Sequence, residues 1–229
     1  MLAILYDVHG NLPALETVLA DARDQGADAF LLGGDYALFG GWPAETVARL
    51  RELTPATWIR GNGERWTAAP AEAPDQPVVQ GAIAAAQEAL GAPLVAELAR
   101  LPFDHADGGT RFVHASPVAD TRSFLPEPAD DEAELLAGVT AERLVFGHTH
   151  LPFRRTAGPT ELVNPGSVGM PFDGDPRAAY ALVHPDGAVE HRRIGYDHAA
   201  SAARVRERFE HAPWTETVAE RIAQARMDV

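Results

Sequence analysis

The first 63 residues repeat one pattern three times: a short apolar segment ends, and an Asp or Asn follows it within a few residues. The segments are residues 2–6, 29–32 and 57–60, and the polar residues beyond them are Asp7, Asp35 and Asn62. Helical spacing of apolar residues follows the first two segments, over residues 12–26 and 43–53. Alternating strands and helices predict a parallel sheet, in which ligands bind beyond the carboxyl ends of the strands. We therefore expect these three side chains to share one edge of a sheet.

Two later predicted strands end in histidine. Residues 110–113 lead into His114, and residues 144–146 lead into Gly147 and then His148-Thr149-His150. Side chains at positions i and i+2 of an extended chain project to the same face, so His148 and His150 can converge on one centre or on two adjacent ones. Imidazole is the commonest protein ligand of metal ions. The pair alone is a weak motif, and its meaning depends on the rest of the chain.

The remaining segments predict what surrounds these strand ends. A Pro- and Ala-rich stretch within residues 67–101 continues into two helical segments, which we expect to lie over or beside the site. Short strands joined by Gly-Pro or Pro-Asp-Gly turns predict antiparallel hairpins after His150, the last of them an edge strand. The predicted helices are residues 78–90, 93–101, 130–137, 199–209 and 214–225, and the predicted late strands are residues 153–156, 161–164, 178–184 and 188–194. Without an internal repeat, residues 1–229 read as one domain that ends in helices over residues 199–229.

Composition narrows the chemistry. The chain has no cysteine, which excludes thiolate catalysis and leaves any metal ion to His, Asp, Glu and Asn. The formal net charge of −14 makes a nucleic-acid polymer an unfavourable partner, because affinity for DNA or RNA comes largely from neutralising phosphates. A bound cation would still give a small phosphorylated substrate a positive centre. We expect a cytoplasmic protein with no membrane segment, since no apolar run reaches the length that spans a bilayer.

The residues beyond the strand ends form a set of two acids, one amide and four imidazoles. They are Asp7, His9, Asp35, Asn62, His114, His148 and His150. This set is too large for one four-coordinate ion and suits two metal ions that share a bridging carboxylate, with positions open for water and substrate. Taken singly, each residue has an ordinary explanation, such as a turn histidine for His9 or a helix cap for Asp7 and Asp35. Their occurrence together and in this order favours the metal site.

The ordered motifs resemble those of the calcineurin-like metallophosphoesterases. The family series of D-x-H, G-D, G-N, a lone His after a strand and G-H-x-H stands here as Asp7-Val8-His9, Gly34-Asp35, Gly61-Asn62, His114 and Gly147-His148-Thr149-His150. The resemblance covers residues 2 to about 172, and residues 164–169, Asn-Pro-Gly-Ser-Val-Gly, are similar to the small prokaryotic branch. It implies a four-layer αββα sandwich of two mixed β-sheets flanked by helices, an α+β or α/β fold, with residues 67–101 as a helical cap insertion.

The resemblance also implies the roles of the site residues. Asp35 would bridge two divalent ions, which we expect to be Mn, Fe, Ni or Zn. One ion would take Asp7, His9 and His150, and the other would take Asn62, His114 and His148. A water shared by the ions would lose a proton and attack phosphorus in line, with Asp35, Asn62 and His148 as the catalytic set. The expected substrates are small phosphomonoesters or phosphodiesters, nucleotides included, and Arg65 and Arg122 are candidates for contacting the phosphate. The oligomeric state is not predicted.

One position departs from the family pattern. After the G-N motif the family usually has His or Cys as the acid that protonates the leaving group, and here Gly63 stands in that place, followed by Glu64. Three readings follow: the leaving group needs little help, another residue such as Glu64 or His105 takes the role, or catalysis is weak. General-acid help is worth roughly 10²–10⁴-fold, so the third reading describes a metal-containing protein that mainly binds or senses phosphate or nucleotide. A nuclease would share the metal chemistry but fits the acidic composition poorly.

Overall fold

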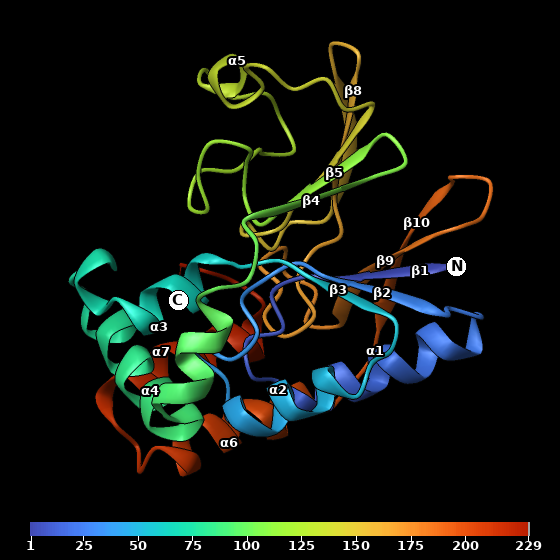
Figure 1. Ribbon diagram of the computed structural model, residues 1–229. Helices are drawn as coiled ribbons and strands as arrows, with labels where there is room; N and C mark the ends of the chain where they lie inside the picture. Colours follow the sequence, from blue (N-terminus) through green and yellow to red (C-terminus); the bar gives the residue numbers. More distant parts are fainter. Residues whose placement is uncertain (229) are drawn as a thin grey trace.

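Two five-stranded mixed sheets form the centre of the molecule, seen in a computed structural model that describes residues 1–228 (Figure 1). The first sheet has the order β10-β9-β1-β2-β3 and the second has the order β4-β5-β6-β8-β7. The strands are β1 (Leu2–Leu5), β2 (Ala29–Leu32), β3 (Ala56–Trp58), β4 (Asp104–Asp107), β5 (Thr110–Val113), β6 (Arg143–Val145), β7 (Phe153–Ala157), β8 (Thr160–Asn164), β9 (Ala178–Val183) and β10 (Val189–Ile194). Strands β1, β2 and β3 are parallel, as are β5, β6 and β8, while β9, β10, β4 and β7 pair antiparallel.

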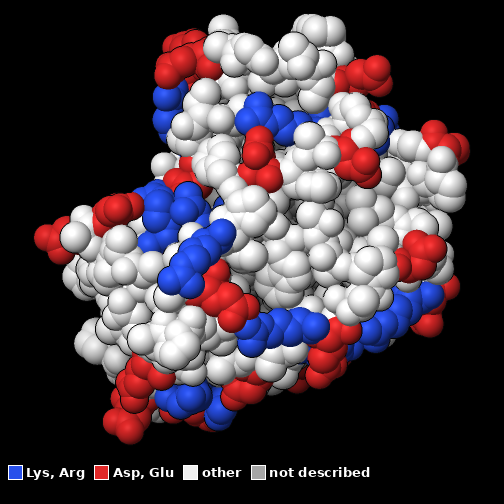
Figure 2. All heavy atoms as spheres, viewed as in Figure 1, with Lys and Arg blue, Asp and Glu red and all other residues white. Residues whose placement is uncertain are grey.

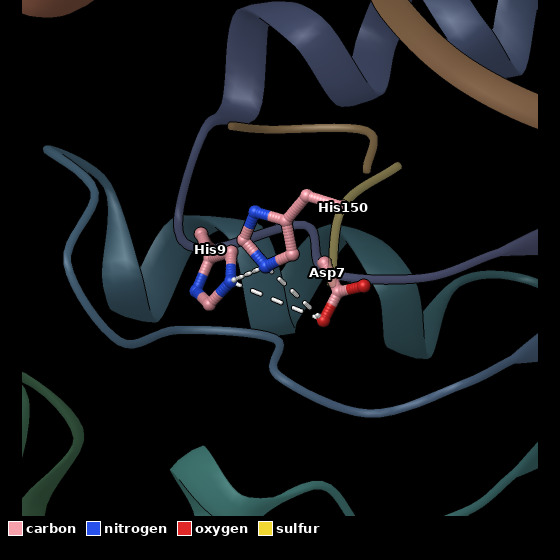
Figure 3. Close-up of side chains that lie close together, drawn as sticks. All are labelled: Asp7, His9 and His150. Atoms are coloured by element: carbon pink, nitrogen blue, oxygen red, sulfur yellow. Dashed lines mark hydrogen bonds and ion pairs between the residues drawn. The ribbon is translucent and has the colours of Figure 1, made fainter. Parts of the chain in front are cut away.

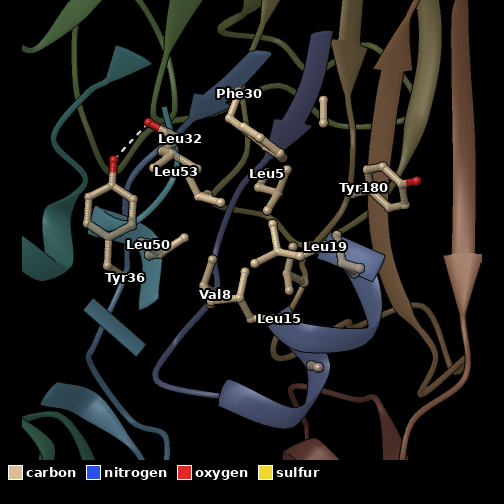
Figure 4. Close-up of a cluster of buried hydrophobic side chains, with 14 of the residues drawn as sticks. Leu5, Val8, Leu15, Leu19, Phe30, Leu32, Tyr36, Leu50, Leu53 and Tyr180 are labelled. Carbon is tan, nitrogen blue, oxygen red and sulfur yellow. Dashed lines mark hydrogen bonds between the residues drawn. The ribbon is translucent and has the colours of Figure 1, made fainter. Parts of the chain in front are cut away.

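Apolar side chains divide the molecule into layers. Helices α1 (Leu12–Asp24) and α2 (Pro43–Arg51) cover the outer face of the first sheet, where Leu15, Leu19 and Leu50 pack with the strands (Figure 4). Ile4 and Tyr6 from the first sheet meet residues of β5, β6 and β8 between the two sheets. Short α5 (Glu132–Leu135) and the loops around it cover the second sheet. The predicted αββα sandwich is therefore confirmed, with an outer layer on the second sheet that is mostly loop.

The strand register explains why the polar strand ends meet. Leu5 of β1 pairs with Leu32 of β2, so both strands stop at the same level and deliver their following residues to one edge. In the second sheet Phe112 of β5 pairs with Val145 of β6, so these two strands also stop at one level. The segments that carry His114 and His148 therefore leave the sheet at the same edge. The first helix starts where the sequence predicts, because the Asn11 side chain caps it by accepting a hydrogen bond from the Ala14 N–H at 3.4 Å.

A second group of helices packs beside the first sheet and has an apolar core of its own (Figure 1). It consists of α3 (Asn62–Ala68), the 3₁₀ turn η1 (Pro70–Glu72), α4 (Pro77–Leu98), α6 (His198–Arg208) and α7 (Pro213–Gln224). We call this group the helical lobe. Its core joins segments that lie more than 100 residues apart, since Ile83 of α4 packs with Val205 of α6 and Val218 of α7.

Helix α4 differs from its prediction in one respect. Within residues 1–228 it is the single helix long and apolar enough to cross a membrane by length and composition, with a mean hydropathy of 1.3, so the expectation that no run reaches spanning length was wrong. Gly91 has non-helical angles (φ 72°, ψ 153°), however, and Pro93 follows it. This break separates the two predicted helices, and Ile83 and Ala86 pack into the lobe.

Three elements were not predicted: the 3₁₀ turn η1 in the Pro- and Ala-rich stretch, strand β4 and helix α3. Strand β4 has the polar sequence Asp-His-Ala-Asp and is half exposed at the sheet edge, so it lacks the apolar alternation that marks a strand. Helix α3 begins at Asn62, inside a Gly-Asn-Gly sequence that reads as a turn. The other elements agree with their predictions apart from shifts of a few residues at their ends.

Candidate metal centre

The backbone of the predicted ligands is unusual. Five of the seven residues have positive φ angles: Asp7 (53°), His9 (49°), Asp35 (56°), His148 (68°) and His150 (58°). Residues with a Cβ rarely adopt this left-handed conformation, and where they do the surrounding structure must hold them in it. Here the segments beyond β1 and β2 are tied together, since the Asp7 N–H donates to Gly34 O at 3.2 Å and the His9 N–H donates to Asp35 O at 2.9 Å. These bonds turn the side chains toward one point.

Asp7, His9 and His150 form the first cluster (Figure 3). The Nε2 atoms of His9 and His150 lie 3.1 Å apart, and Asp7 Oδ1 lies 4.0 Å from the first and 3.6 Å from the second. All three side chains are buried. Asp7 Oδ2 accepts a hydrogen bond from the His148 N–H at 3.0 Å, whereas Asp7 Oδ1 has no hydrogen-bond partner among the described residues. An orphaned buried carboxylate oxygen facing two ring nitrogens is a site that a cation would satisfy.

Backbone carbonyls fix the imidazoles of this cluster. His9 Nδ1 lies 3.0 Å from Leu38 O, and His150 Nδ1 pairs in the same way with Met170 O. A carbonyl can only accept, so each Nδ1 carries the proton and each Nε2 turns its lone pair inward. Ser167, which reads as a plain turn residue in the sequence, links the backbone of Asp7 to that of Met170. Its hydroxyl donates to Asp7 O at 2.7 Å and accepts from the Met170 N–H at 2.8 Å.

Asn62, His114 and His148 form the second cluster. The side-chain amide of Asn62 places one atom 2.9 Å from both His114 Nε2 and His148 Nδ1, and hydrogen bonding assigns it as the nitrogen, which donates to the two rings. His114 Nδ1 donates to Gly33 O at 2.8 Å, which leaves its Nε2 with an inward lone pair. If the amide turned by 180°, its oxygen would join the two imidazole nitrogens as a third donor atom for a cation. This donor set therefore also fits a metal ion.

Asp35 lies between the two clusters. Its Oδ2 is 3.8 Å from His9 Nε2, and its Oδ1 is 3.5 Å from His114 Nε2. Asp7 Oδ1 is also within reach of the second cluster, at 3.9 Å from His114 Nε2. One carboxylate thus faces each cluster with a different oxygen, which is the arrangement that a bridging ligand requires.

Glu64 holds the backbone around Asp35. Its carboxylate is buried and accepts three backbone N–H bonds, from Asp35 at 2.9 Å, Tyr36 at 2.8 Å and Gly61 at 2.8 Å. Both carboxylate oxygens are occupied by these bonds, so the structure holds Glu64 as an acceptor of backbone N–H groups and not as a free proton donor. His105 lies on β4 and stacks on Phe112 at 6.1 Å between ring centroids, so the structure does not bring it to the centre either.

Gly63 has a structural role of its own. Its N–H donates to Asp35 Oδ1 at 2.7 Å, and a Cβ added at this position would lie 2.9 Å from that oxygen. The residue that stands in the place of the family acid thus lets the start of α3 approach Asp35 closely. A side chain here would have to move the carboxylate that lies between the clusters.

Burial sets the protonation of the centre before any ion binds. It lowers the pKa of His9 to about 3 and that of His148 to about 4, with neighbouring imidazoles adding to the effect. Burial, together with nearby Glu64 and Asp7, raises the pKa of Asp35 to about 7 against the opposing effect of His114. His114 has a raised pKa because Asp35 and Asp7 outweigh its burial. His9 and His148 are therefore neutral near pH 7, the form that binds metal ions.

The two predicted phosphate-binding arginines have different surroundings. Arg65 of α3 lines the cleft beside the centre, but its guanidinium makes two 2.7 Å bonds to Asp120 and a 2.8 Å bond to Glu72. Arg122 is 41% exposed, pairs with Asp131 and Glu134, and does not line the cleft. The structure thus brings the seven predicted ligands and Arg65 together and leaves Arg122 outside.

The cleft has a volume of about 590 Å³ and opens beside both clusters. Asp35, Asn62 and His148 line it together with side chains of the helical lobe. On the face shown in Figure 2, acidic and basic side chains are interspersed and form no continuous basic stripe. The cleft therefore suits a small molecule better than a polymer of phosphates.

The fold and this donor set are those of a metal-dependent phosphoesterase, and residues 1–188 match the calcineurin-like phosphoesterase superfamily domain. The chain belongs to this family, as its motifs predict. It is 30% identical to the phosphodiesterase YfcE of Escherichia coli over 191 residues, which cover 79% of this chain and 85% of YfcE. A metallophosphoesterase from Sphaerobacter thermophilus has 30% identity and a TM-score of 0.83 over 98% of this chain and 99% of its own. Protein PH1004 from Pyrococcus horikoshii shares the fold, with 21% identity and a TM-score of 0.83 over 97% of this chain and 99% of its own.

Proposed function

We propose that this protein hydrolyses small phosphomonoesters or phosphodiesters at a centre that holds two divalent ions. Asp7, His9 and His150 would hold one ion, Asn62, His114 and His148 would hold the other, and Asp35 would contact both. The observation that supports this most is the inward direction of the lone pairs, above all the orphaned Asp7 Oδ1. Nitrogen and oxygen donors without sulfur suit Mn, Fe, Ni or Zn.

The charges of the donor set favour an anionic substrate. When bound, the two ions would supply Lewis acidity at the phosphoryl oxygens and a water of lowered pKa. Only Asp7 and Asp35 bring negative charge to the ligand set, while Asn62 contributes a neutral oxygen. The loaded centre would therefore keep positive charge, which binds phosphate even though the protein as a whole carries −14.

The residues of the centre would hold the metal ligands in place and would not transfer protons to the leaving group. His9 and His150 are held by backbone carbonyls, and Glu64 and Gly63 fix the segment that carries Asp35. No proton donor stands at position 63, so the leaving group receives less help than in relatives with His or Cys there. We therefore expect esters with acidic alcohols to react fastest. We keep the cytoplasm as the expected compartment and a small phosphorylated molecule as the expected partner.

Gly63 also supports a second candidate function. A protein with this metal cage and no general acid could bind or sense phosphate or nucleotide and turn it over slowly. Phosphate binding by calorimetry, with turnover near the uncatalysed rate even for aryl esters, would favour this function over the first.

The hydrolytic function can be tested with metal-free protein reloaded with manganese, nickel or zinc. We expect metal-dependent hydrolysis of p-nitrophenyl phosphate or bis(p-nitrophenyl) phosphate, with p-nitrophenyl esters ahead of alkyl esters by more than their solution reactivity explains. Absence of turnover with every ion, in samples that elemental analysis shows to contain two ions per chain, would rule the proposal out.

A further inference from the structure

The wall of the cleft beyond the metal centre is aromatic. Phe39, Trp66 and Phe172 line it, together with the buried side chains of Val79 and Met170. Phe172 stacks on the His150 imidazole, with ring centroids 4.4 Å apart and an interplanar angle of 16°. Phe39 packs on the His9 imidazole at 5.6 Å. The aromatic surface thus begins at the first metal cluster and continues into the helical lobe.

Phe39 is held in its place against backbone preference. Its φ angle is 82°, a left-handed conformation that bulky residues seldom adopt. Strained residues of this kind gather at functional sites, because only a surrounding structure that over-determines them keeps them there. The strained residue here lines the cleft while its ring also packs against the apolar core of the helical lobe.

Arg221 of α7 gives the lobe side of the cleft a positive charge. Its Nε donates to Met227 O at 3.2 Å, and no carboxylate within residues 1–228 lies within ion-pair distance. Burial alone lowers the pKa of its guanidinium, since no acidic neighbour opposes the effect. Arg65, the other arginine in the cleft wall, is already neutralised by Asp120 and Glu72. Among residues 1–228, Arg221 is therefore the cleft arginine whose charge no carboxylate offsets.

The segment that carries Arg221 lies outside the family domain. The match to the superfamily ends at residue 188, and β10, α6 and α7 follow it. The metal centre thus comes from the shared domain, whereas the far side of the cleft comes partly from this C-terminal addition.

We propose that the lobe side of the cleft binds the alcohol portion of the substrate, as a planar aromatic group against Trp66, Phe39 and Phe172 with a second anionic group paired to Arg221. This inference rests on the proposed function, since it places the phosphoryl group at the metal centre. The substrate class is an aromatic phosphoester that carries a further negative charge. A carboxylate and a second phosphate share the negative charge that a guanidinium binds, so each fits as the second anionic group.

Paired esters test the charge. The rate constant kcat/KM is measured for phenyl phosphate, 4-carboxyphenyl phosphate and benzene-1,4-diyl bisphosphate with the metal-loaded wild-type protein and Arg221→Gln. We expect Arg221→Gln to lower kcat/KM for at least one of the two charged esters at least tenfold more than for phenyl phosphate. The charged ester that loses more identifies the anion. An equal loss for all three esters would overturn the pairing. Arg208→Gln, which removes an arginine of α6 that does not line the cleft, is the matched control and should change none of these ratios.

A second measurement tests the aromatic wall and separates this inference from the hydrolytic function. Benzylphosphonate, 4-carboxybenzylphosphonate and ethylphosphonate cannot be hydrolysed, and their Kd values are measured by calorimetry. We expect Trp66→Leu to weaken benzylphosphonate at least fivefold more than ethylphosphonate, and Arg221→Gln to weaken 4-carboxybenzylphosphonate at least tenfold more than benzylphosphonate. These results in a protein without turnover would keep the binding site and reject the hydrolase. Turnover with no such selectivity would reject the binding site and keep the hydrolase.

Discussion

The metal centre and the lobe side of the cleft are built in opposite ways. At the centre, seven polar residues follow strand ends, five of them have strained backbones, and carbonyls and Glu64 fix the set. Across the cleft, aromatic and apolar side chains come from α3, α4 and the loops between strands, and α7 contributes Arg221, which no carboxylate within residues 1–228 pairs. The residues proposed for the reaction thus lie in short sequence motifs. The residues proposed for substrate selectivity are far apart in the sequence and come together only in the folded chain.

Asp35→Ala tests the first half of this comparison and has the largest expected effect. Asp35 faces both clusters, so its loss should weaken both ions and lower kcat/KM at least about 1,000-fold. Metal-loaded protein assayed with p-nitrophenyl phosphate, beside an Asp24→Ala control on exposed α1 surface, measures the change. Activity within tenfold of wild type, or two ions retained per chain, would remove Asp35 from the bridging position.

The next prediction concerns the rigidity of the centre. Glu64→Ala leaves the buried N–H groups of Asp35, Tyr36 and Gly61 without an acceptor. The free energy of unfolding should fall by about 3 kcal/mol, because buried donors without partners are costly. Urea unfolding of metal-free protein measures it, with Glu88→Ala on the exposed face of α4 as the control. A loss similar to that of the control would mean that the centre does not depend on this clamp.

Gly81→Ala addresses the lobe without touching the centre. A Cβ at this position would lie 2.3 Å from the Trp214 ring, so α4 and α7 must separate, at a cost of about 2 kcal/mol. Gly195→Ala, where a Cβ meets no atom within 4 Å, is the control. If the two regions are independent, Gly81→Ala lowers stability in urea and shifts ester selectivity while the wild-type number of bound ions is kept. Loss of the ions would show that the lobe supports the centre.

The smallest effect concerns pH. In the metal-free protein burial raises the pKa of Asp35 to about 7, so below that pH the carboxyl must release a proton before it can bind an ion. Metal affinity should therefore rise by roughly tenfold per pH unit up to pH 7 and level off above it. Calorimetric titration in buffers of different ionisation enthalpy reports the protons released. A pH-independent affinity between pH 5.5 and 7 would contradict this protonation of the centre.

The centre was predictable because each ligand lies within four residues of a strand end, and the order of the motifs carries the information. The alternation of strands and helices predicted only a parallel sheet, and the two-sheet sandwich followed from the resemblance of the motifs to the family. The sequence left Glu64 open as a replacement for the missing acid. It shows that Glu64 follows Gly63, but it does not show which groups the carboxylate contacts. Phe39, Trp66 and Arg221 were not predicted at all. An aromatic residue in an apolar pattern reads as core, and nothing in the sequence places residue 221 opposite residue 66.

The same reasoning explains the fate of the two predicted arginines. Arg65 and Arg122 were candidates for contacting the phosphate, yet both pair with carboxylates, and Arg122 lies outside the cleft. Which of nineteen basic residues keeps its charge for a ligand depends on neighbours brought in by the fold. Arg221 differs from both, because no carboxylate within residues 1–228 lies within ion-pair distance of its guanidinium.

The most direct test of the account is the anomalous diffraction of crystals soaked in manganese. We predict two peaks, with Asp7, His9 and His150 around one, Asn62, His114 and His148 around the other, and Asp35 in contact with both. A single peak, or a second ion held without Asp35, would contradict the two-ion centre.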